Sequence, residues 1–418
     1  MAIRPSHTVV FIVTSFWAYG ELAIATEFAA RMSGSGWHPL FLVPPTHRAT
    51  VAAAGLDHQV MIPGAGKINR ILLGDIEHVH RPAAVVLADF LNYDFCERHY
   101  GLTRADLSVF GCPVGTFDDF SWGRPGAWMD TYGFPAKYQG EVSVEGLDFR
   151  LRPCPLNDPL AEAAADVHRY AMAQDVTDLP VAERDAVRRE LGVRSGRPVV
   201  LVTGATWQRM HAAYPRVTAF VEACHTMLER LLEALLEHAD VLAIGPRLVL
   251  RDREPDGFHA LGPVPPDRFA RLVQAVDLHV SNNIVSVSTH RLALRGVPSV
   301  VLGNSLHKRA GRLQWQSPDA PEPTDFARKV LDGVDYLYPC SMFPVGWFHF
   351  LRSLLEGNPF AAMLARVETF DERGTLETTL SLLEDGPRRR DLARARESYL
   401  ETLRKFPDVE TILHKVAA

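Results

Sequence analysis

The chain has 418 residues, of which 47% are hydrophobic and 22% are charged, so it can bury two or three globular cores and is neither disordered nor fibrous. Its formal net charge of -6 argues against a nucleic-acid partner, because that function needs clustered lysine and arginine. The five cysteines form no C-x-x-C pair and no zinc-ligand spacing, which indicates reduced thiols in a cytoplasmic protein without a metal.

The first half of the chain alternates predicted strands with helical patterns. Residues 8–15 are rich in Val, Ile and Phe, as in a strand buried on both faces of a parallel sheet. A helix begins near Gly20 and Glu21 and stops at Gly34 and Gly36. Further strands are predicted at 39–43, 60–62, 83–90 and 108–117. These elements predict an α/β domain over residues 1–175.

A charged linker ends in Ser-Gly-Arg-Pro at 195–198, and a second α/β series follows it. Its predicted elements are strands at 199–207, 241–246 and 277–283 and a long helix at 217–238. This predicts a second domain over residues 176–385. For the aromatic-rich stretch at 335–351, a packed hydrophobic insertion is favoured over an acceptor-binding surface. The sequence of residues 386–418 predicts a charged amphipathic helix. Whether this helix packs on the first domain is not decided by the sequence.

The segment 280–302 carries the strongest functional signal. It reads as a strand, a helix start rich in hydroxyl groups, a Gly-Val-Pro turn and a second strand. Ser286, Ser288 and Thr289 lie where the first backbone N–H groups of a helix lack partners, so this helix end can bind an anion. Such an arrangement at the edge of a parallel sheet is typical of a nucleotide diphosphate site.

The layout resembles that of the GT-B glycosyltransferases, in particular their UDP-glycosyltransferase and MurG-like branch, over about residues 8–303. The similar segments are the opening strand, loop and helix at 13–32, the strand and loop at 199–207, and the approach to the donor at 261–283. The resemblance implies two Rossmann-type domains facing across a cleft. It also implies a metal-independent, inverting transfer of a sugar from a nucleoside-diphosphate donor to a small-molecule acceptor, with no cofactor.

In this resemblance, Asn283 falls at the histidine of the family's His-Gly-Gly motif, Ser288 and Thr289 fall at its hydroxyl pair, and the Val264 backbone falls at its nucleobase contact. Together with the sequence pattern, the predicted donor-binding residues are Gly204, Thr206, Val264, Asn282, Asn283, Ser286, Ser288, Thr289 and His290.

Three positions depart from the family pattern. Arg291 stands where the family commonly places a ribose-binding glutamate, and a guanidinium has no hydrogen-bond acceptor. Ile284 and Val285 replace glycines that let the backbone approach a diphosphate. The acidic pair that often follows the next strand is absent from 303–308. The chain is therefore expected to be a divergent member.

Three carboxylates are candidates for the chemistry. Glu21 lies at the family's usual histidine position and could act as the base if its environment raises its pKa. An equally weighted alternative is that Glu21 only stabilises the start of its helix. Asp118 and Asp119 follow a predicted strand at the same sheet edge, where paired carboxylates can orient or activate a base or bind an amine-bearing acceptor. The alternative is that the two residues only form an Asp-rich turn. Asp89 has a similar but weaker case.

Two other functions stay open from sequence. One is a nucleotide-sugar epimerase or hydrolase on the same fold, and the other is a non-catalytic, transferase-like binding or helper protein, which Arg291, Ile284 and Val285 would suit. No run reaches the roughly 18 apolar residues that span a bilayer, so no transmembrane segment is expected. The expected partners are the nucleotide-sugar donor and the acceptor, and a homodimer is left open.

Overall fold

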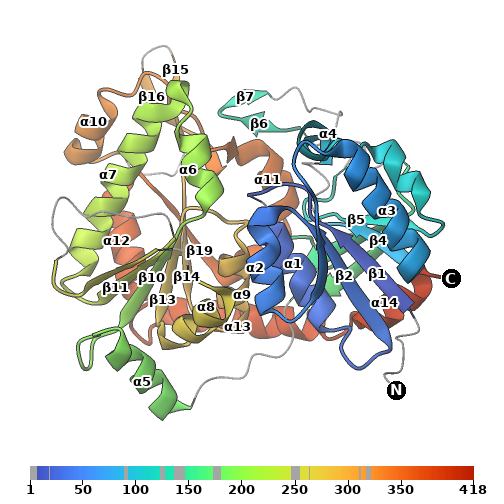
Figure 1. The fold of residues 1–418 in the computed structure, drawn as a ribbon. Helices are drawn as coiled ribbons and strands as arrows, with labels where there is room; N and C mark the ends of the chain where they lie inside the picture. The colour runs from blue at the N-terminus through green and yellow to red at the C-terminus, as the bar shows by residue number, and fades with distance from the viewer. Residues whose placement is uncertain are drawn as a thin grey trace. The chain divides into compact units, whose positions relative to one another are not determined.

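A computed structural model describes residues 7–17, 19–88, 93–122, 128–135, 146–172, 180–245, 255–262, 264–309, 312–316 and 322–418. The chain divides into two compact units (Figure 1). Unit 1 comprises Met1–Pro125, Val142–Gln174 and Glu401–Ala418, and unit 2 comprises Gly126–Glu141 and Asp175–Leu400. Each unit has its own parallel sheet with helices packed on it, which confirms the prediction of two Rossmann-type domains.

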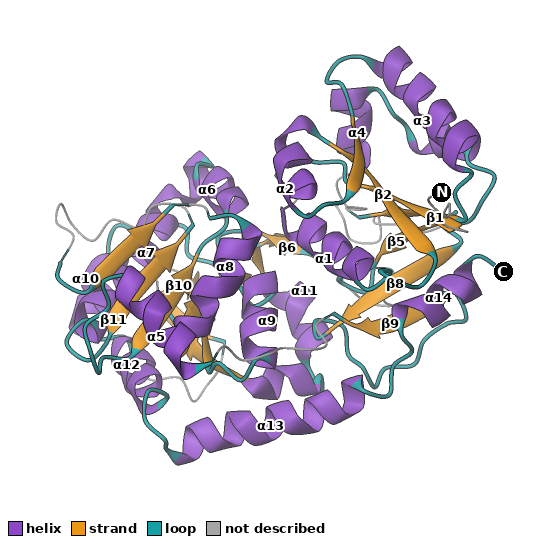
Figure 2. Cartoon of the chain, turned by 60° about the horizontal axis from the view of Figure 1, so that its bottom comes forward, coloured by secondary structure: helices purple, strands orange, loops and turns teal. Residues whose placement is uncertain are grey.

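Unit 1 is built on a seven-stranded sheet in the order β3-β2-β1-β4-β5-β8-β9. Its strands are β1 (His7–Ile12), β2 (Trp37–Val43), β3 (Asp57–Val60), β4 (Ala84–Leu87), β5 (Val114–Phe117), β8 (Phe149–Cys154) and β9 (Val167–Ala171). Its helices are α1 (Tyr19–Ala30), η1 (Pro45–His47), α2 (Arg48–Ala53), α3 (Gly66–His80), α4 (Tyr93–Tyr100), η2 (Arg104–Val109) and α14 (Val409–Val416). Figure 2 shows the strands in orange with the helices around them.

The core of unit 1 forms around the apolar part of β1, residues 9–12. Val9, Val10 and Phe11 are fully buried, as expected for a strand with helices on both sides of its sheet. The Phe11 ring stacks on Phe41 of β2, with 5.0 Å between the ring centroids. The predicted strand at 108–117 begins only at Val114, because Ser108 and Val109 end η2 and residues 110–113 lie outside any strand.

Unit 2 is built on a six-stranded parallel sheet in the order β12-β11-β10-β13-β14-β19. Its strands are β10 (Val199–Thr203), β11 (Asp240–Ile244), β12 (Phe258–Leu261), β13 (Leu278–Ser281), β14 (Ser299–Gly303) and β19 (Leu364–Glu368). Its helices are α5 (Val181–Glu190), α6 (Thr206–Ala212), η3 (Pro215–Val217), α7 (Thr218–Leu235), α8 (Pro266–Leu272), η4 (Val273–Ala275), α9 (Val287–Leu294), α10 (Asp325–Leu331), α11 (Phe348–Leu355), η5 (Pro359–Met363) and α12 (Glu372–Ser381).

Unit 2 also takes in a segment from the first half of the chain. The short strands β6 (Asp130–Thr131) and β7 (Phe134–Pro135) form a four-stranded sheet with β17 (Cys340–Met342) and β18 (Gly346–Trp347). The buried Asp130 carboxylate accepts hydrogen bonds from the backbone N–H groups of His349, at 3.0 Å, and Phe350, at 3.1 Å. This carboxylate therefore caps the start of α11 from a distant part of the sequence.

The aromatic-rich stretch lies partly in the core of unit 2. Tyr338 and Phe343 are buried, and the Tyr338 ring lies 4.4 Å from that of Phe220 on α7. An antiparallel hairpin of β15 (Leu306–Arg309) and β16 (Arg312–Trp315) precedes this stretch. The observed packing agrees with the hydrophobic insertion that the sequence favours.

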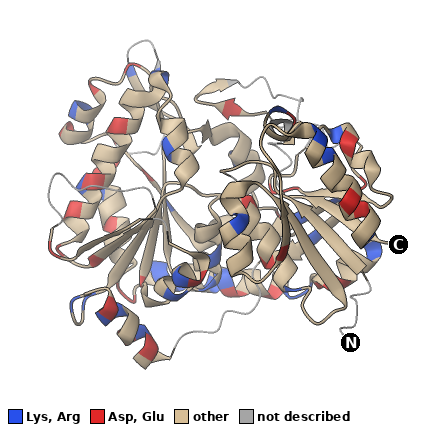
Figure 3. Cartoon of the chain, viewed as in Figure 1, with Lys and Arg blue, Asp and Glu red and all other residues tan. Residues whose placement is uncertain are grey.

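The tail forms two helices, α13 (Pro387–Leu403) and α14. Residues from Glu401 onward belong to unit 1, where Leu413 is fully buried and the His414 ring lies 5.4 Å from that of Trp37. Basic and acidic positions are present in both units (Figure 3). Within the described part of the chain, no helix combines the length and apolar character that crossing a bilayer requires.

Candidate functional site

The strand order of unit 2 reverses between β10 and β13. The chain continues from β10 to β11 on one side, whereas β13 pairs on the other side, with Thr203 opposite Ser281. In open parallel sheets, ligands bind outside the carboxyl ends of the strands at such a reversal. The loop at 204–205 and the loop at 282–286 both leave the sheet at this edge. The sheet therefore brings the two predicted donor-binding loops to neighbouring strand ends.

Gln208 of α6 joins these two loops. Its Oε1 accepts a hydrogen bond from the Ala205 N–H at 2.7 Å, and its Nε2 donates to Asn282 Oδ1 at 2.8 Å and to the Phe343 carbonyl at 2.9 Å. Gln208 is buried, so these bonds are shielded from water. Gln208 could not be predicted from the sequence, because a glutamine two positions into a helix has no local signature of a loop-to-loop contact.

The turn before α9 is held by its own side chains. The Asn283 N–H donates to Ser281 Oγ at 3.1 Å, and Asn283 Oδ1 accepts from the Val285 N–H at 3.1 Å. The Thr289 hydroxyl donates to the Asn283 carbonyl at 3.2 Å. Asn283 and Thr289 are both buried. These two predicted donor-binding side chains therefore shape the turn, and their groups are used within the protein.

The first turn of α9 presents the groups that an anion needs. Ser286 occupies the N-cap position, and its side chain makes no capping hydrogen bond. Ser288 is half-buried and lies in the first turn. The first N–H groups of a helix have no partner within the helix and carry a partial positive charge. Backbone amides and two serine hydroxyls therefore lie together at the helix end where the sequence predicts an anion site.

His290, a further predicted donor-binding residue, has a buried side chain in α9. Its ring is buried against Phe360, and Nε2 lies 3.2 Å from the Ile284 carbonyl. Burial lowers the pKa of His290 to about 4, and the hydrogen bond to Ile284 opposes part of that decrease. The imidazole is therefore neutral near pH 7 and supports the turn through Ile284.

This burial predicts a pH dependence of stability. The unfolded chain takes up a proton at His290 below its ordinary pKa of 6.5, whereas the folded chain does so only near 4. As the pH falls through this window, we expect the free energy of unfolding to lose about 3 kcal/mol from this residue. His290→Gln should reduce the loss when urea unfolding is followed at several pH values, and the exposed His238→Gln control should not. Equal pH profiles for both variants would contradict the prediction.

The other predicted donor-binding residues lie at the same sheet edge. The Gly204 N–H donates to the Ile244 carbonyl at 3.1 Å, and a side chain at Gly245 would overlap the Gly204 carbonyl. Thr206 is exposed at the first position of α6. Val264 follows β12, which lies two strands away from β10 in the sheet. Its side chain packs on the hydrophobic cluster that includes Leu201 and Ile244. Val264 therefore lies farther from α9 in the strand order than Gly204 does.

The sheet of unit 1 has its own reversal, between β1 and β4. Glu21 is half-buried in the first turn of α1, directly after the loop that follows β1. His47, which was not predicted from the sequence, is buried, and its Nε2 lies 3.1 Å from the Ser15 carbonyl in that loop. The His47 ring lies 4.5 Å from that of Tyr19. His47 therefore supports the segment that carries Glu21.

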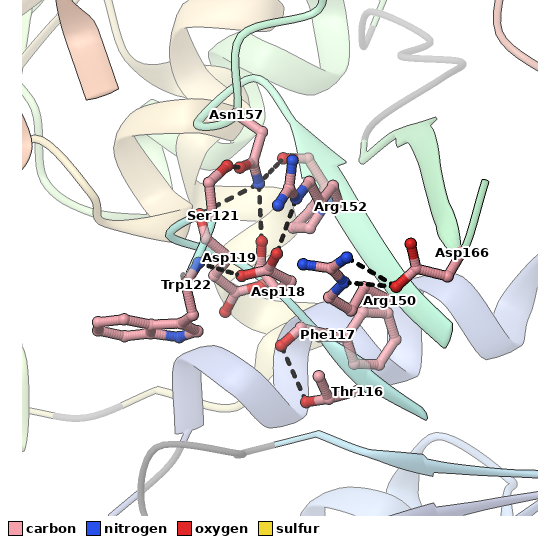
Figure 4. A network of polar contacts seen from close by, with 11 residues as sticks. Thr116, Phe117, Asp118, Asp119, Ser121, Trp122, Arg150, Arg152, Asn157 and Asp166 are labelled. Atoms are coloured by element: carbon pink, nitrogen blue, oxygen red, sulfur yellow. Dashed lines mark hydrogen bonds and ion pairs between the residues drawn. The ribbon is translucent and has the colours of Figure 1, made fainter. Parts of the chain in front are cut away.

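Asp118 is fully buried in a polar network at the end of β5 (Figure 4). Its Oδ2 lies 2.7 Å from Nε of Arg152 on β8, and its Oδ1 accepts from the Trp122 N–H at 2.6 Å. Burial raises the pKa of Asp118, and the Arg152 guanidinium opposes that rise. Asn157 Nδ2 also donates to the carbonyls of Asp118 and Asp119, at 3.0 and 3.1 Å. The network therefore fixes the turn at Asp118 and Asp119 to the adjacent strand.

This geometry predicts a large structural effect for Asp118→Asn. The Arg152 side chain, only 14% exposed, would keep its charge without its carboxylate, which should cost about 3 kcal/mol in the free energy of unfolding. Asp166→Asn is the matched control, because Asp166 pairs with Arg150 at 2.7 Å but is 37% exposed. We expect it to cost less than about 1 kcal/mol in urea unfolding. Similar losses in both variants would contradict the assignment.

Asp119 lies in the same turn and is half-buried. Burial raises the pKa of the Tyr170 hydroxyl well above its ordinary value, and the negative charge of Asp119 adds to this effect. Asp89 lies outside the described residues.

No group of three or more His, Cys, Asp or Glu side chains that could hold a metal ion occurs among the residues that the structure describes. All five cysteines are free.

Solved structures with the same fold include several glycosyltransferases. SnogD from Streptomyces nogalater is 16% identical, with 99% of this chain and 100% of SnogD covered and a TM-score of 0.54. The spinosyn rhamnosyltransferase SpnG is 15% identical, with 98% and 99% covered and a TM-score of 0.52. The glycosyltransferase VinC, in complex with dTDP, is 13% identical, with 98% and 99% covered and a TM-score of 0.54. These full-length matches confirm the predicted GT-B fold.

A further SpnG structure contains thymidine diphosphate. The model of a family of unknown function (DUF6365) matches residues 28–418. A search among curated proteins found no match.

Proposed function

The chain belongs to the family of unknown function DUF6365, and we propose that it is a glycosyltransferase that moves a sugar from a nucleoside-diphosphate donor to a small-molecule acceptor. The observation that carries this proposal is the sheet reversal in unit 2, where Gln208 joins the loop after β10 to the loop that opens α9. The fold shared with SnogD, SpnG and VinC supports it.

In this proposal, the donor diphosphate binds at the first turn of α9. The amides of this turn and the Ser286 and Ser288 hydroxyls stabilise the negative charge that develops as the diphosphate leaves. Asn282 and Asn283 hold the turn, and Gly204 and Thr206 border it from the neighbouring loop. A helix end that stabilises the leaving diphosphate makes a metal ion unnecessary for that role, which is why we propose a metal-independent reaction.

Unit 1 supplies the base in this proposal. Glu21 takes the proton from an acceptor hydroxyl as that oxygen attacks the anomeric carbon and the diphosphate leaves from the opposite face, which inverts the configuration. Asp119 orients the acceptor through its carboxylate. Asp118 acts as a positioning residue, because its carboxylate is fully buried and engaged by Arg152 and the Trp122 N–H.

A binding experiment tests the donor assignment. Isothermal titration with dTDP, UDP and GDP should give micromolar affinity for at least one of them, and dTDP is the first choice because SpnG and VinC structures contain it. Mass spectrometry of reactions with the matching nucleotide sugar and a panel of hydroxylated acceptors then detects transfer. Absence of binding to every nucleotide would overturn the proposal. Binding with nucleotide-sugar hydrolysis or epimerisation but no transfer would favour the alternative enzyme class.

A further inference from the structure

Helix α3 of unit 1 has an apolar stripe on its solvent side. Ile68, Ile71 and Val79 are 53%, 63% and 67% exposed, although large apolar side chains are usually buried. Their spacing of three and eight residues places them on one side of the helix. The buried side is formed by different residues, Leu73 and Ile76 among them. The core of unit 1 therefore does not explain this second apolar side.

Charges of opposite sign flank the centre of the stripe. Lys67 and Asp75 are both exposed and lie four residues before and four residues after Ile71. Residues four apart form one row along a helix, so the row reads basic, apolar and acidic. Both charge signs are visible on the helices of unit 1 (Figure 3).

A row with this order is complementary to itself. When two such helices meet antiparallel about a twofold axis at Ile71, the Ile71 side chains contact each other. Lys67 of each copy then lies opposite Asp75 of the other, which gives two equivalent ion pairs. Packing along rows of residues four apart is also the commonest geometry between helices in globular proteins.

We propose that the exposed face of α3, formed by Lys67, Ile68, Ile71, Asp75 and Val79, is a homodimer interface. A second copy fits better than an unrelated protein, because only a twofold contact requires a surface to match itself. The 15-residue helix is about 22 Å long, so the contact is centred on a short helix pair and the dimer forms at micromolar concentrations.

Sedimentation velocity of the full chain tests the proposal. Wild-type protein should approach twice its 46.5 kDa mass as its concentration rises through the micromolar range. Ile71→Glu should remain at 46.5 kDa, because it places two carboxylates on the twofold axis. Leu160→Glu is the control, since Leu160 is a 69% exposed apolar residue of the same unit outside α3, and it should dimerise as wild type does.

A charge exchange gives the sharper test. Lys67→Asp and Asp75→Lys should each weaken dimerisation about tenfold, since each brings like charges together. The double variant Lys67→Asp/Asp75→Lys should regain wild-type dimerisation within about threefold, because the ion pairs are re-formed in reverse. Circular dichroism confirms that each variant is folded. A monomeric wild type, a dimeric Ile71→Glu or no recovery in the double variant would overturn the proposal.

Discussion

Replacing Ser288 with glutamate is expected to weaken nucleoside-diphosphate binding by about tenfold or more without reducing the stability of the fold. The added carboxylate would lie in the first turn of α9, beside the proposed position of the diphosphate. Like charges about 5 Å apart at a partly exposed site repel by roughly 1–3 kcal/mol, and each 1.4 kcal/mol corresponds to a tenfold change in affinity.

The same carboxylate should favour the helix itself. A negative charge in a first turn interacts well with the unpaired N–H groups and stabilises a helix by about 0.5 kcal/mol. Stability and ligand binding are therefore expected to change in opposite directions. A general loss of folding cannot produce this combination, so the variant separates ligand repulsion from structural damage.

Ala182→Glu is the matched control for Ser288→Glu. Ala182 is exposed in the first turn of α5, so this variant adds the same charge at a similar helix position of unit 2. We expect it to bind dTDP as wild type does. Isothermal titration measures the affinity, and thermal unfolding measures the stability of each variant. Unchanged affinity in Ser288→Glu would refute the diphosphate site at α9.

The parallel strands could be predicted from sequence where both of their faces are buried. Residues 9–12 of β1 and residues 199–202 of β10 are continuous apolar runs, which is the pattern such strands require. β8 could not be predicted in this way, because Arg150 and Arg152 alternate with its buried residues. Their partners, Asp166 and Asp118, become neighbours only in the folded chain. A local pattern cannot reveal such pairs.

The segment at 126–141 is a second case in which contacts between distant parts of the sequence could not be predicted from a local pattern. β6 and β7 have two residues each, which is too short for a periodic signal. Thr131 pairs with Gly346, far along the sequence, and Asp130 caps α11. These long-range contacts determine that the segment belongs to unit 2. Its sequence therefore offers no evidence of the unit to which it belongs.

The helix start at α9 could be predicted, but the use of each side chain could not. Hydroxyl and amide side chains can bind a ligand or the nearby backbone with similar ease. Asn283 and Thr289 bind the backbone in this structure, whereas the Ser286 side chain makes no capping hydrogen bond. Choosing between the two uses requires the geometry of the turn.

Glu21→Gln is expected to lower kcat for sugar transfer by about a hundredfold to ten-thousandfold, because an amide cannot accept the acceptor's proton. Glutamine keeps the size of the side chain, so α1 should fold as before. Donor affinity should also remain unchanged, since the proposed diphosphate site lies on α9 of the other unit. Kinetics with the acceptor found by product screening, combined with dTDP titration, measure both quantities.

Glu27→Gln is the matched control for Glu21, because Glu27 lies later in α1 and pairs with Arg31 at 3.2 Å. Both variants remove one negative charge from the same helix, so a general electrostatic effect would lower their rates alike. A base at Glu21 instead predicts that only Glu21→Gln loses kcat and the acidic limb of the pH-rate profile. Full activity in Glu21→Gln would exclude this carboxylate as the base and leave Asp119 as the candidate in unit 1.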